Sequence, residues 1–145
     1  TSVIKRASEY HCLMTRLRAE KVQKVQNDIP DVEVLGDKDA ELLLLGWGSS
    51  IGSMRASAEV IAKSGRKVAI VNLRYLNPFP KNLEEVLRKY KKVAVVELNL
   101  GQLNMVIRSK FMIDTAFLGR VIGQRISVVE MVEFINNELD LLKEH

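Results

Sequence analysis

The sequence predicts an α/β fold in which helices cover both faces of a parallel sheet. Three apolar runs, at residues 42–45, 67–73 and 93–97, lack the alternation of a half-exposed strand. That pattern is typical of strands that are buried on both faces. Helical patterns separate the runs, so strand and helix alternate along the chain. Right-handed crossovers then bring the carboxyl ends of the three strands to one edge of the sheet.

The amino-terminal part is expected to form a helix and a weak strand. Apolar residues recur at helical spacing over residues 9–27. Pro30 ends this helix, because proline lacks a backbone donor and restricts the residue before it. Residues 32–36 follow as a weak strand, and a turn leads from them into the first buried strand.

Capping residues predict where the next helices begin and end. Residues 50–64 have apolar positions at helical spacing, and Gly65 is placed to end that helix. Asn82 has Glu85 three residues later, which is the spacing of a capping pair. A short helix is therefore expected directly after residue 82.

The last third of the chain repeats the same arrangement. Asn99 and Gln102 have cap spacing for a helix that follows the third buried strand. Residues 117–122 form the last expected strand. Ser127 with Glu130 is a capping box that opens the final helix.

Length and composition are those of an ordinary globular domain. The 145 residues are 47% hydrophobic and 28% charged, and no apolar run approaches the ~20 residues of a membrane helix. The amino terminus has no secretory signal pattern. Cys12 is the single cysteine, so the chain can form neither an internal disulfide nor an all-cysteine metal site. We expect a cytoplasmic protein with no membrane association.

The chain starts without methionine inside a helical pattern, which suggests a domain cut from a longer protein. Residues 1–30 are expected to be a connecting helix, and residues 31–145 the α/β domain. The net charge is +4, and residues 1–28 hold six basic and three acidic residues. No aromatic residues are interleaved with these basic ones, so we expect no nucleic-acid partner.

Several kinds of catalytic site are excluded by the residues that the chain lacks. His11 and His145 have no partner at metal-ligand spacing, so no metal site is expected. Serine hydrolysis needs a base beside the nucleophile, and no suitable histidine exists. Nothing matches the phosphate-loop pattern GxxxxGK[ST]. We therefore assign no catalytic residues.

A glycine-rich turn at residues 46–52 leaves a nucleotide site open. Gly46, Gly48 and Gly52 follow a strand and open a helix, as in a dinucleotide fingerprint. The spacing is GxGxxxG and no acidic residue ends the next strand, so a structural turn is the favoured interpretation.

Polar residues gather where the three buried strands end, and these are the candidate binding residues. They are Ser49, Ser50, Arg74, Glu97, Asn99 and Gln102, with Asn72 and Tyr75 nearby. Free backbone N–H groups at the helix starts could hold an anion, and Arg74 could pair with Glu97 or clamp a carboxylate or phosphate. In the structural alternative, Glu97 and its neighbours satisfy cap and loop backbone groups. The structural role is the favoured one for each residue.

Three segments carry a family resemblance that extends over most of the chain. LGWGSSIGSMRASAEVI, VAIVNLRYLNPFP and VAVVELNLGQL resemble the C-terminal domain of the alpha subunit of 2-oxoacid:ferredoxin oxidoreductases. The 2-oxoglutarate branch looks nearest. The resemblance implies a transketolase C-terminal-like fold, with a five-stranded sheet that is mostly parallel and has one antiparallel edge strand.

The same resemblance implies a large enzyme around this chain. Such an enzyme decarboxylates a 2-oxo acid on thiamine diphosphate and magnesium, passes electrons through an iron–sulfur cluster to ferredoxin, and forms an acyl-coenzyme A. The partners would be the N-terminal domain of the same subunit and the other subunits, and a homodimer stays open. Gly36-Asp37 lacks the second glycine of the family's diphosphate motif, and Gly123-Gln124-Arg125 departs from the relatives before the last helix.

Two classes of function follow. In the first, the chain is a structural domain of a 2-oxoacid:ferredoxin oxidoreductase and is inactive alone. In the second, it is a small nucleotide-binding or regulatory module that uses the glycine turn and Arg74. The equivalent domain of another thiamine enzyme is a further alternative, although the ELNLGQ segment argues against it.

Overall fold

The computed structural model describes residues 25–76, 78–97, 102–119 and 125–144, with the side chain of Ser49 also left out. The chain separates into two units. One consists of Thr1–Asp31 and Tyr75–Lys81, and the other of Val32–Arg74 and Asn82–His145. The predicted helix over residues 9–27 falls largely outside the described residues, and residues 25–28 are helical.

The first unit joins two segments that are far apart in the sequence. The side-chain amide of Gln26 donates a hydrogen bond to the backbone oxygen of Phe79 at 2.9 Å. Ile29 and Phe79 are both buried. Phe79, which belongs to the second of the three segments that carry the family resemblance, therefore lies beside Gln26.

The second unit contains a five-stranded sheet in the order β1-β3-β2-β4-β5. Its strands are β1 (Leu35–Gly36), β2 (Leu42–Trp47), β3 (Ala69–Leu73), β4 (Lys92–Glu97) and β5 (Thr115–Gly119). Only β1 is antiparallel to its neighbour. The prediction of a mostly parallel sheet with one antiparallel edge strand is confirmed.

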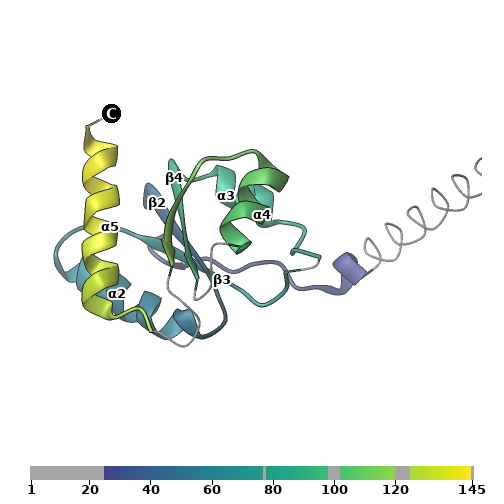
Figure 1. The fold of residues 1–145 in the computed structure, drawn as a ribbon, viewed down its shortest axis with the longest axis horizontal. Helices are drawn as coiled ribbons and strands as arrows, with labels where there is room; N and C mark the ends of the chain where they lie inside the picture. Colours follow the sequence, from purple (N-terminus) through teal and green to yellow (C-terminus); the bar gives the residue numbers. More distant parts are fainter. Residues whose placement is uncertain (1–24, 77, 98–101, 120–124, 145) are drawn as a thin grey trace, which may run out of the picture. The chain divides into compact units, whose positions relative to one another are not determined.

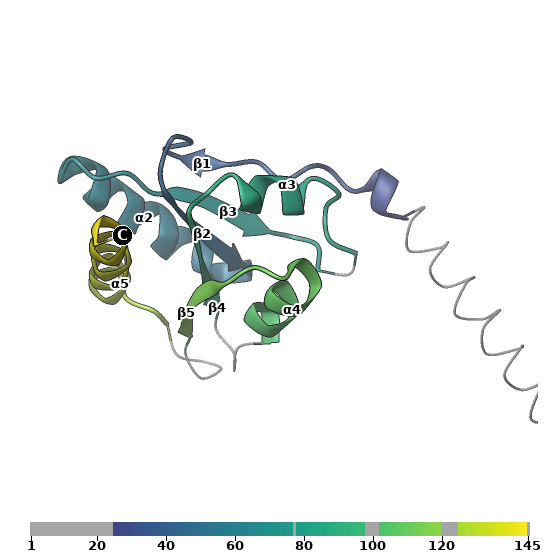
Figure 2. The same cartoon turned by 90° about the horizontal axis from the view of Figure 1, so that it is seen from above.

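Helices cover both faces of this sheet. After the short 3-10 helix η1 (Gly48–Ser50) come α2 (Ile51–Lys63), α3 (Leu83–Arg88), α4 (Gln102–Phe111) and α5 (Val128–Lys143). Figure 1 shows α2 and α5 together on one side of the strands and α3 and α4 on the other. The view from above in Figure 2 shows the same division. The prediction of three layers is confirmed.

Alternate residues of the central strands pack against opposite helix layers. On the α2 and α5 side, one cluster joins strand, α2 and α5 residues: Leu42, Leu44, Ile70, Ala94, Met54, Ile61, Met131 and Ile135. The residues between them face the other layer. Leu43 and Leu45 are fully buried, as are Leu83 of α3 and Ile107 of α4. The absence of polar alternation in the sequence has this physical cause.

The caps predicted for α2 and α5 are confirmed. Gly65 follows α2 with φ of +86°, a left-handed conformation that favours glycine at a helix end. The Ser127 hydroxyl accepts the backbone N–H of Glu130 at 3.1 Å at the start of α5. The last strand begins earlier than predicted, at Thr115 instead of residue 117, and residues 120–122 lie outside the described residues.

The capping pair predicted for α3 is wrong. Asn82 precedes the helix, but its side chain makes no cap hydrogen bond. Its Oδ1 accepts the backbone N–H of Val32 at 2.8 Å, and its Nδ2 donates to the Val32 oxygen at 3.2 Å. The amide therefore satisfies both backbone groups of a residue 50 positions away in the sequence and ties the chain before β1 to the start of α3.

Replacing Asn82 with alanine should lower the free energy of unfolding by about 1 to 2 kcal/mol, because two hydrogen bonds are lost. Urea unfolding followed by circular dichroism measures this. Glu85→Ala is the matched control, since Glu85 is exposed and, within the described part of the chain, its side chain forms an ion pair with Lys89. It should cost about 0.5 kcal/mol or less. The opposite ranking of the two variants would support the local capping pair instead.

Candidate functional site

The carboxyl ends of the three central strands meet at one edge of the sheet. Gly46 of β2 is in register with Asn72 of β3 on one side and with Val96 of β4 on the other. β2 leads into α2 on one face, whereas the next helix after β4 is α4 on the opposite face. The space between strands that lead to opposite faces is where ligands bind in open α/β sheets. The predicted gathering of strand ends is confirmed.

The turn after β2 is closely packed. Gly48 has φ of +74°, which a side chain would strain. A Cβ on Gly46 would come within 2.5 Å of the Met54 methyl group and 2.9 Å of the Ser50 hydroxyl oxygen. The Ser50 hydroxyl is buried and donates to the backbone oxygen of Trp47 at 3.3 Å. These glycines and Ser50 therefore serve the turn itself.

Glu97 is the central feature of this edge. It ends β4, is fully buried, and both of its carboxylate oxygens accept backbone N–H groups of α4. Leu103 donates to Oε1 at 3.2 Å and Asn104 to Oε2 at 2.9 Å. These are the second and third residues of α4, the positions that an N-cap side chain normally satisfies. The carboxylate also lies at the positive end of the helix dipole.

The other candidate residues do not converge on Glu97. Arg74 follows β3 and is exposed, and among the described residues it forms no ion pair with Glu97. Gln102 is the exposed first residue of α4. Asn99 and the Ser49 side chain lie outside the described residues. The structure thus brings Ser50, Arg74 and Glu97 to one edge without joining them into a single site.

Two further polar residues lie near this edge, and the sequence pattern did not assign them roles. The Thr115 hydroxyl of β5 donates to Oδ1 of Asn104, so α4 is fastened to both β4 and β5. Asn72 of β3 has a buried Oδ1 that finds no hydrogen-bond partner among the described residues. The contact between Thr115 and Asn104 joins a strand to a helix, so no pattern within either element predicts it.

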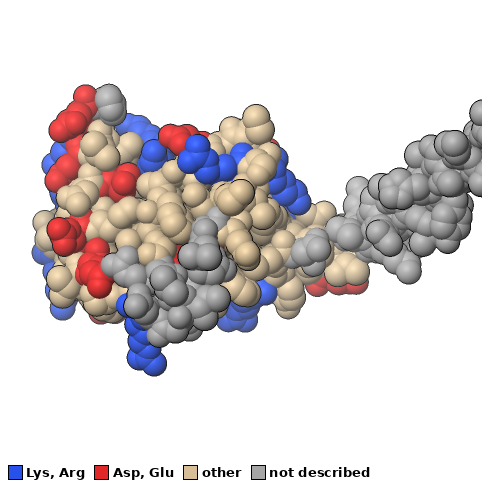
Figure 3. All heavy atoms as spheres, in the orientation of Figure 1, with Lys and Arg blue, Asp and Glu red and all other residues tan. Residues whose placement is uncertain are grey.

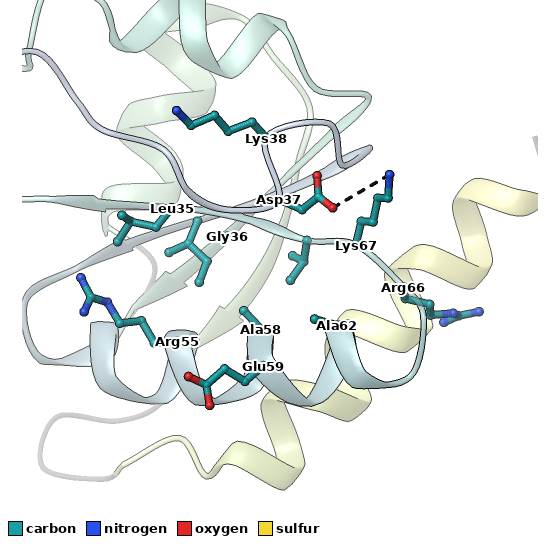
Figure 4. Close-up of a pocket in the computed structure, with 12 residues that line it drawn as sticks. Leu35, Gly36, Asp37, Lys38, Arg55, Ala58, Glu59, Ala62, Arg66 and Lys67 are labelled. Atoms are coloured by element: carbon teal, nitrogen blue, oxygen red, sulfur yellow. Dashed lines mark ion pairs between the residues drawn. The ribbon is translucent and has the colours of Figure 1, made fainter.

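A concave region lies away from the carboxyl edge. Figure 4 shows a pocket of about 620 Å³ between α2 and the edge strand β1. Its β3 side is formed by residues at the opposite end of the strand from Arg74, including Val68 and Ile70. Asp37 and Lys67 form an ion pair at 4.0 Å on one wall, and Arg55 and Glu59 extend from α2. The lining has mixed charge and no histidine or cysteine.

The groups with displaced pKa values lie at the amino ends of the strands. Burial, followed by the charges of Asp39 and Asp37, raises the pKa of Tyr90, which precedes β4. A hydrogen bond and charge from Lys92, with a smaller effect of Arg108, lower the pKa of Asp114, which precedes β5. These residues hold loops and strand starts together and are not part of the carboxyl edge.

The described residues do not fit the thiamine diphosphate and magnesium that the resemblance implies for the whole enzyme. Asp37, the acid of the incomplete diphosphate motif, accepts the N–H of Asp39 at 3.0 Å and pairs with Lys67. Within the described part of the chain, no group of three or more His, Cys, Asp or Glu side chains could hold a metal ion. None of the described helices combines the length and hydropathy of a membrane-crossing segment.

Taken together, these features define a three-layer α/β domain in which Ser50 and Glu97, at the carboxyl edge, are hydrogen-bonded to backbone groups. Residues 40–131 match the family model described as pyruvate:ferredoxin oxidoreductase core domain II. This match covers more than half of the chain, which therefore belongs to that family.

One relative and two solved structures place the chain within larger proteins. It is 47% identical over 130 residues to the 2-oxoglutarate oxidoreductase subunit KorA of Mycobacterium tuberculosis, which is 89% of this chain and 20% of that protein. Its fold matches a 2-oxoglutarate:ferredoxin oxidoreductase from Magnetococcus marinus with a TM-score of 0.78 and 29% identity, over 88% of this chain and 23% of that one.

A transketolase from Pichia stipitis shares the fold alone, with a TM-score of 0.52 and 13% identity over 78% of this chain and 18% of that one. The chain spans about a fifth of the length of the curated relative. The recognition of an alpha-subunit domain of the 2-oxoacid:ferredoxin oxidoreductases, with a transketolase-like fold, is confirmed.

Replacing Glu97 with alanine should lower the free energy of unfolding by about 2 to 4 kcal/mol, because it removes a helix cap and leaves two inner N–H groups without their acceptor. Glu97→Gln should cost less, since one oxygen acceptor remains. Urea unfolding measures both.

Glu133→Ala is the control for this experiment. Glu133 is an exposed glutamate on α5, so its replacement should change stability by about 0.5 kcal/mol or less. A Glu97→Ala variant as stable as the wild type would show that Glu97 is not needed to hold α4 and is free for another role.

Proposed function

We propose that this chain is a structural domain of the alpha subunit of a 2-oxoglutarate:ferredoxin oxidoreductase, and that it supports the assembly of the enzyme without contributing a catalytic group. The whole enzyme would convert 2-oxoglutarate to an acyl-coenzyme A on thiamine diphosphate. The identity to the KorA subunit and the fold of the Magnetococcus marinus enzyme support the 2-oxoglutarate branch. The latter structure holds 2-oxoglutarate, coenzyme A and succinyl-CoA.

The observation that carries this proposal is the use of Glu97. A catalytic carboxylate must be able to reach substrate or exchange a proton, whereas this one is fully buried and holds two backbone N–H groups of α4. Ser50 is likewise occupied by the turn after β2. Because Glu97 and Ser50 are already hydrogen-bonded to the backbone, the described residues of this edge supply a rigid surface and no acid–base pair.

The cofactors and partners of the whole enzyme are assigned to other domains. With Cys12 as its one cysteine, the chain cannot supply a four-cysteine iron–sulfur site. The N-terminal domain of the same subunit and the neighbouring subunits would hold thiamine diphosphate with magnesium, the cluster and coenzyme A, and would meet ferredoxin. The single cysteine also supports the reducing cytoplasm as the compartment.

A domain-exchange experiment tests the proposal. The segment of the Mycobacterium tuberculosis KorA subunit that corresponds to this chain would be replaced by this chain and the enzyme assembled with its partner subunit. The chimaera should keep 2-oxoglutarate-dependent reduction of a viologen dye, because no catalytic group is exchanged. An assembled chimaera that binds 2-oxoglutarate but does not turn over would contradict a purely structural role.

The isolated chain provides the complementary measurement. It should fold, by circular dichroism, and show no viologen reduction with 2-oxoglutarate, thiamine diphosphate, magnesium and coenzyme A present. Turnover by the isolated chain would overturn the proposal. Titration calorimetry with NAD, NADP, ATP and coenzyme A addresses the alternative of a nucleotide-binding module. Absence of heat at millimolar ligand would remove that alternative, and a saturable site would establish it.

A further inference from the structure

The space between α2 and the edge strand β1, here called the α2–β1 pocket, is left open by small side chains. Its apolar wall comes from three elements and consists of Leu35, Ala58, Ala62, Val68 and Ile70. Leu35 packs against the core cluster but stays only partly buried. Larger side chains at the two alanine positions would cover it and gain stability, because apolar burial is favourable. The chain leaves about 620 Å³ open instead, which is within the range of small-molecule sites.

The side of α2 that borders the pocket differs from the side that packs into the core. Arg55, Ala58 and Ala62 are three and four residues apart, so they lie along one side of the helix. The core side carries Met54 and Ile61, which are fully buried. Figure 4 shows Ala58 and Ala62 beside the space under β1, with Arg55 at one end of it. Departures from full packing are expected at functional positions, and this one is confined to the pocket.

The rim of the α2–β1 pocket is predominantly basic. It carries four basic and two acidic side chains: Lys38, Arg55, Arg66, Lys67, Asp37 and Glu59. Two of the basic groups are already paired, since Lys67 lies 4.0 Å from Asp37 and Arg66 is bonded to Asp140 of α5. The excess of positive charge favours an anionic ligand.

Arg55 is the basic group best placed for such a ligand. Within the described part of the chain, its guanidinium forms no ion pair. Glu59 follows four residues later, which is the spacing of a helix ion pair, yet the two charges are not paired. A guanidinium beside an apolar wall is suited to bind a carboxylate or phosphate group through charge-assisted hydrogen bonds.

From this combination, we propose that the α2–β1 pocket binds a small amphipathic anion. The apolar body of the ligand lies on Ala58 and Ala62, and its carboxylate or phosphate group is held by Arg55. Seven residues of helix separate Arg55 from Ala62, which is about 10 Å. A body of that length therefore contacts both alanines while its anionic end reaches the guanidinium. This inference goes beyond the structural role proposed above and does not depend on it.

An NMR titration of the 145-residue chain with octanoate is the first test. Octanoate combines one carboxylate with an unbranched apolar body. Saturable shifts should appear at the backbone amides of residues 35–38 and 55–62, with a dissociation constant below ~1 mM. Octanol has the same body without the charge, and it should bind at least ~5-fold more weakly. Octyl phosphate shows whether the site prefers a phosphate to a carboxylate.

Arg55→Gln tests the assigned role of the guanidinium. It should raise the dissociation constant of octanoate at least ~5-fold and leave that of octanol unchanged, because the charge contact alone is lost. Lys63→Gln is the matched control, since Lys63 is an exposed cation on α2 that does not line the pocket. It should leave the binding of both ligands unchanged.

Ala62→Leu tests the apolar wall. Ala62 is exposed, and leucine is a good helix former, so this variant should fold and fill part of the pocket. It should weaken octanoate and octanol alike. Val60→Leu is the control, because Val60 is an exposed residue of α2 outside this pocket. Circular dichroism melts of all variants separate loss of binding from loss of folding.

Three results would overturn the proposal: no saturable shift with octanoate up to ~10 mM, equal affinity for octanoate and octanol, or equal weakening by Arg55→Gln and Lys63→Gln. Equal affinity would show an apolar hollow without recognition of the anion. None of these results changes the outcome of the domain-exchange experiment, so failure here is distinct from failure of the proposed function. Figure 3 shows the charged and uncharged atoms on one face of the chain for the choice of further surface controls.

Discussion

Burial of three adjacent parallel strands on both faces is the constraint on which the rest of the structure depends. β2, β3 and β4 have almost entirely apolar side chains because helices cover the sheet on both sides. Polar chemistry is therefore confined to the strand ends and the sheet margins. At the carboxyl ends, the chain must also start two helices, and helix starts leave backbone N–H groups that need acceptors. Glu97 and the turn at Gly48 meet these needs. The carboxylate at this edge is therefore already hydrogen-bonded to the backbone of α4.

The position of Glu97 illustrates how a residue can look catalytic and act structurally. A glutamate at the carboxyl end of a central strand is where many α/β enzymes place a functional group. Here its two oxygens each accept a helix N–H, and Thr115 reaches Asn104 from the neighbouring strand. Buried carboxylates are tolerated when such hydrogen bonds compensate for lost solvation. The contacts join β4, β5 and α4 into one rigid corner, which suits a domain that other domains pack against.

The sequence predicted the layers, the strand directions and most helix boundaries, because these follow from apolar periodicity and local caps such as Ser127. The sequence identified the site residues as a group and favoured cap and loop roles over a ligand site for each of them. What escaped prediction depends on contacts distant in the sequence. Asn82 looks like a helix cap, yet Val32 binds its amide from 50 residues away. The last strand begins at Thr115, which pairs with Val93 of β4, and no pattern within the strand predicts the bond from its hydroxyl to Asn104.

Native-state hydrogen exchange at the amides of Leu103 and Asn104 tests the central claim most directly. If the buried carboxylate of Glu97 holds the start of α4, both amides should exchange as slowly as those in the middle of β4, through global unfolding alone. The first turn of a helix normally exchanges fast, so this protection would be specific to the contact with Glu97. Rapid exchange at both amides, with β4 still protected, would contradict the account and leave Glu97 available for chemistry.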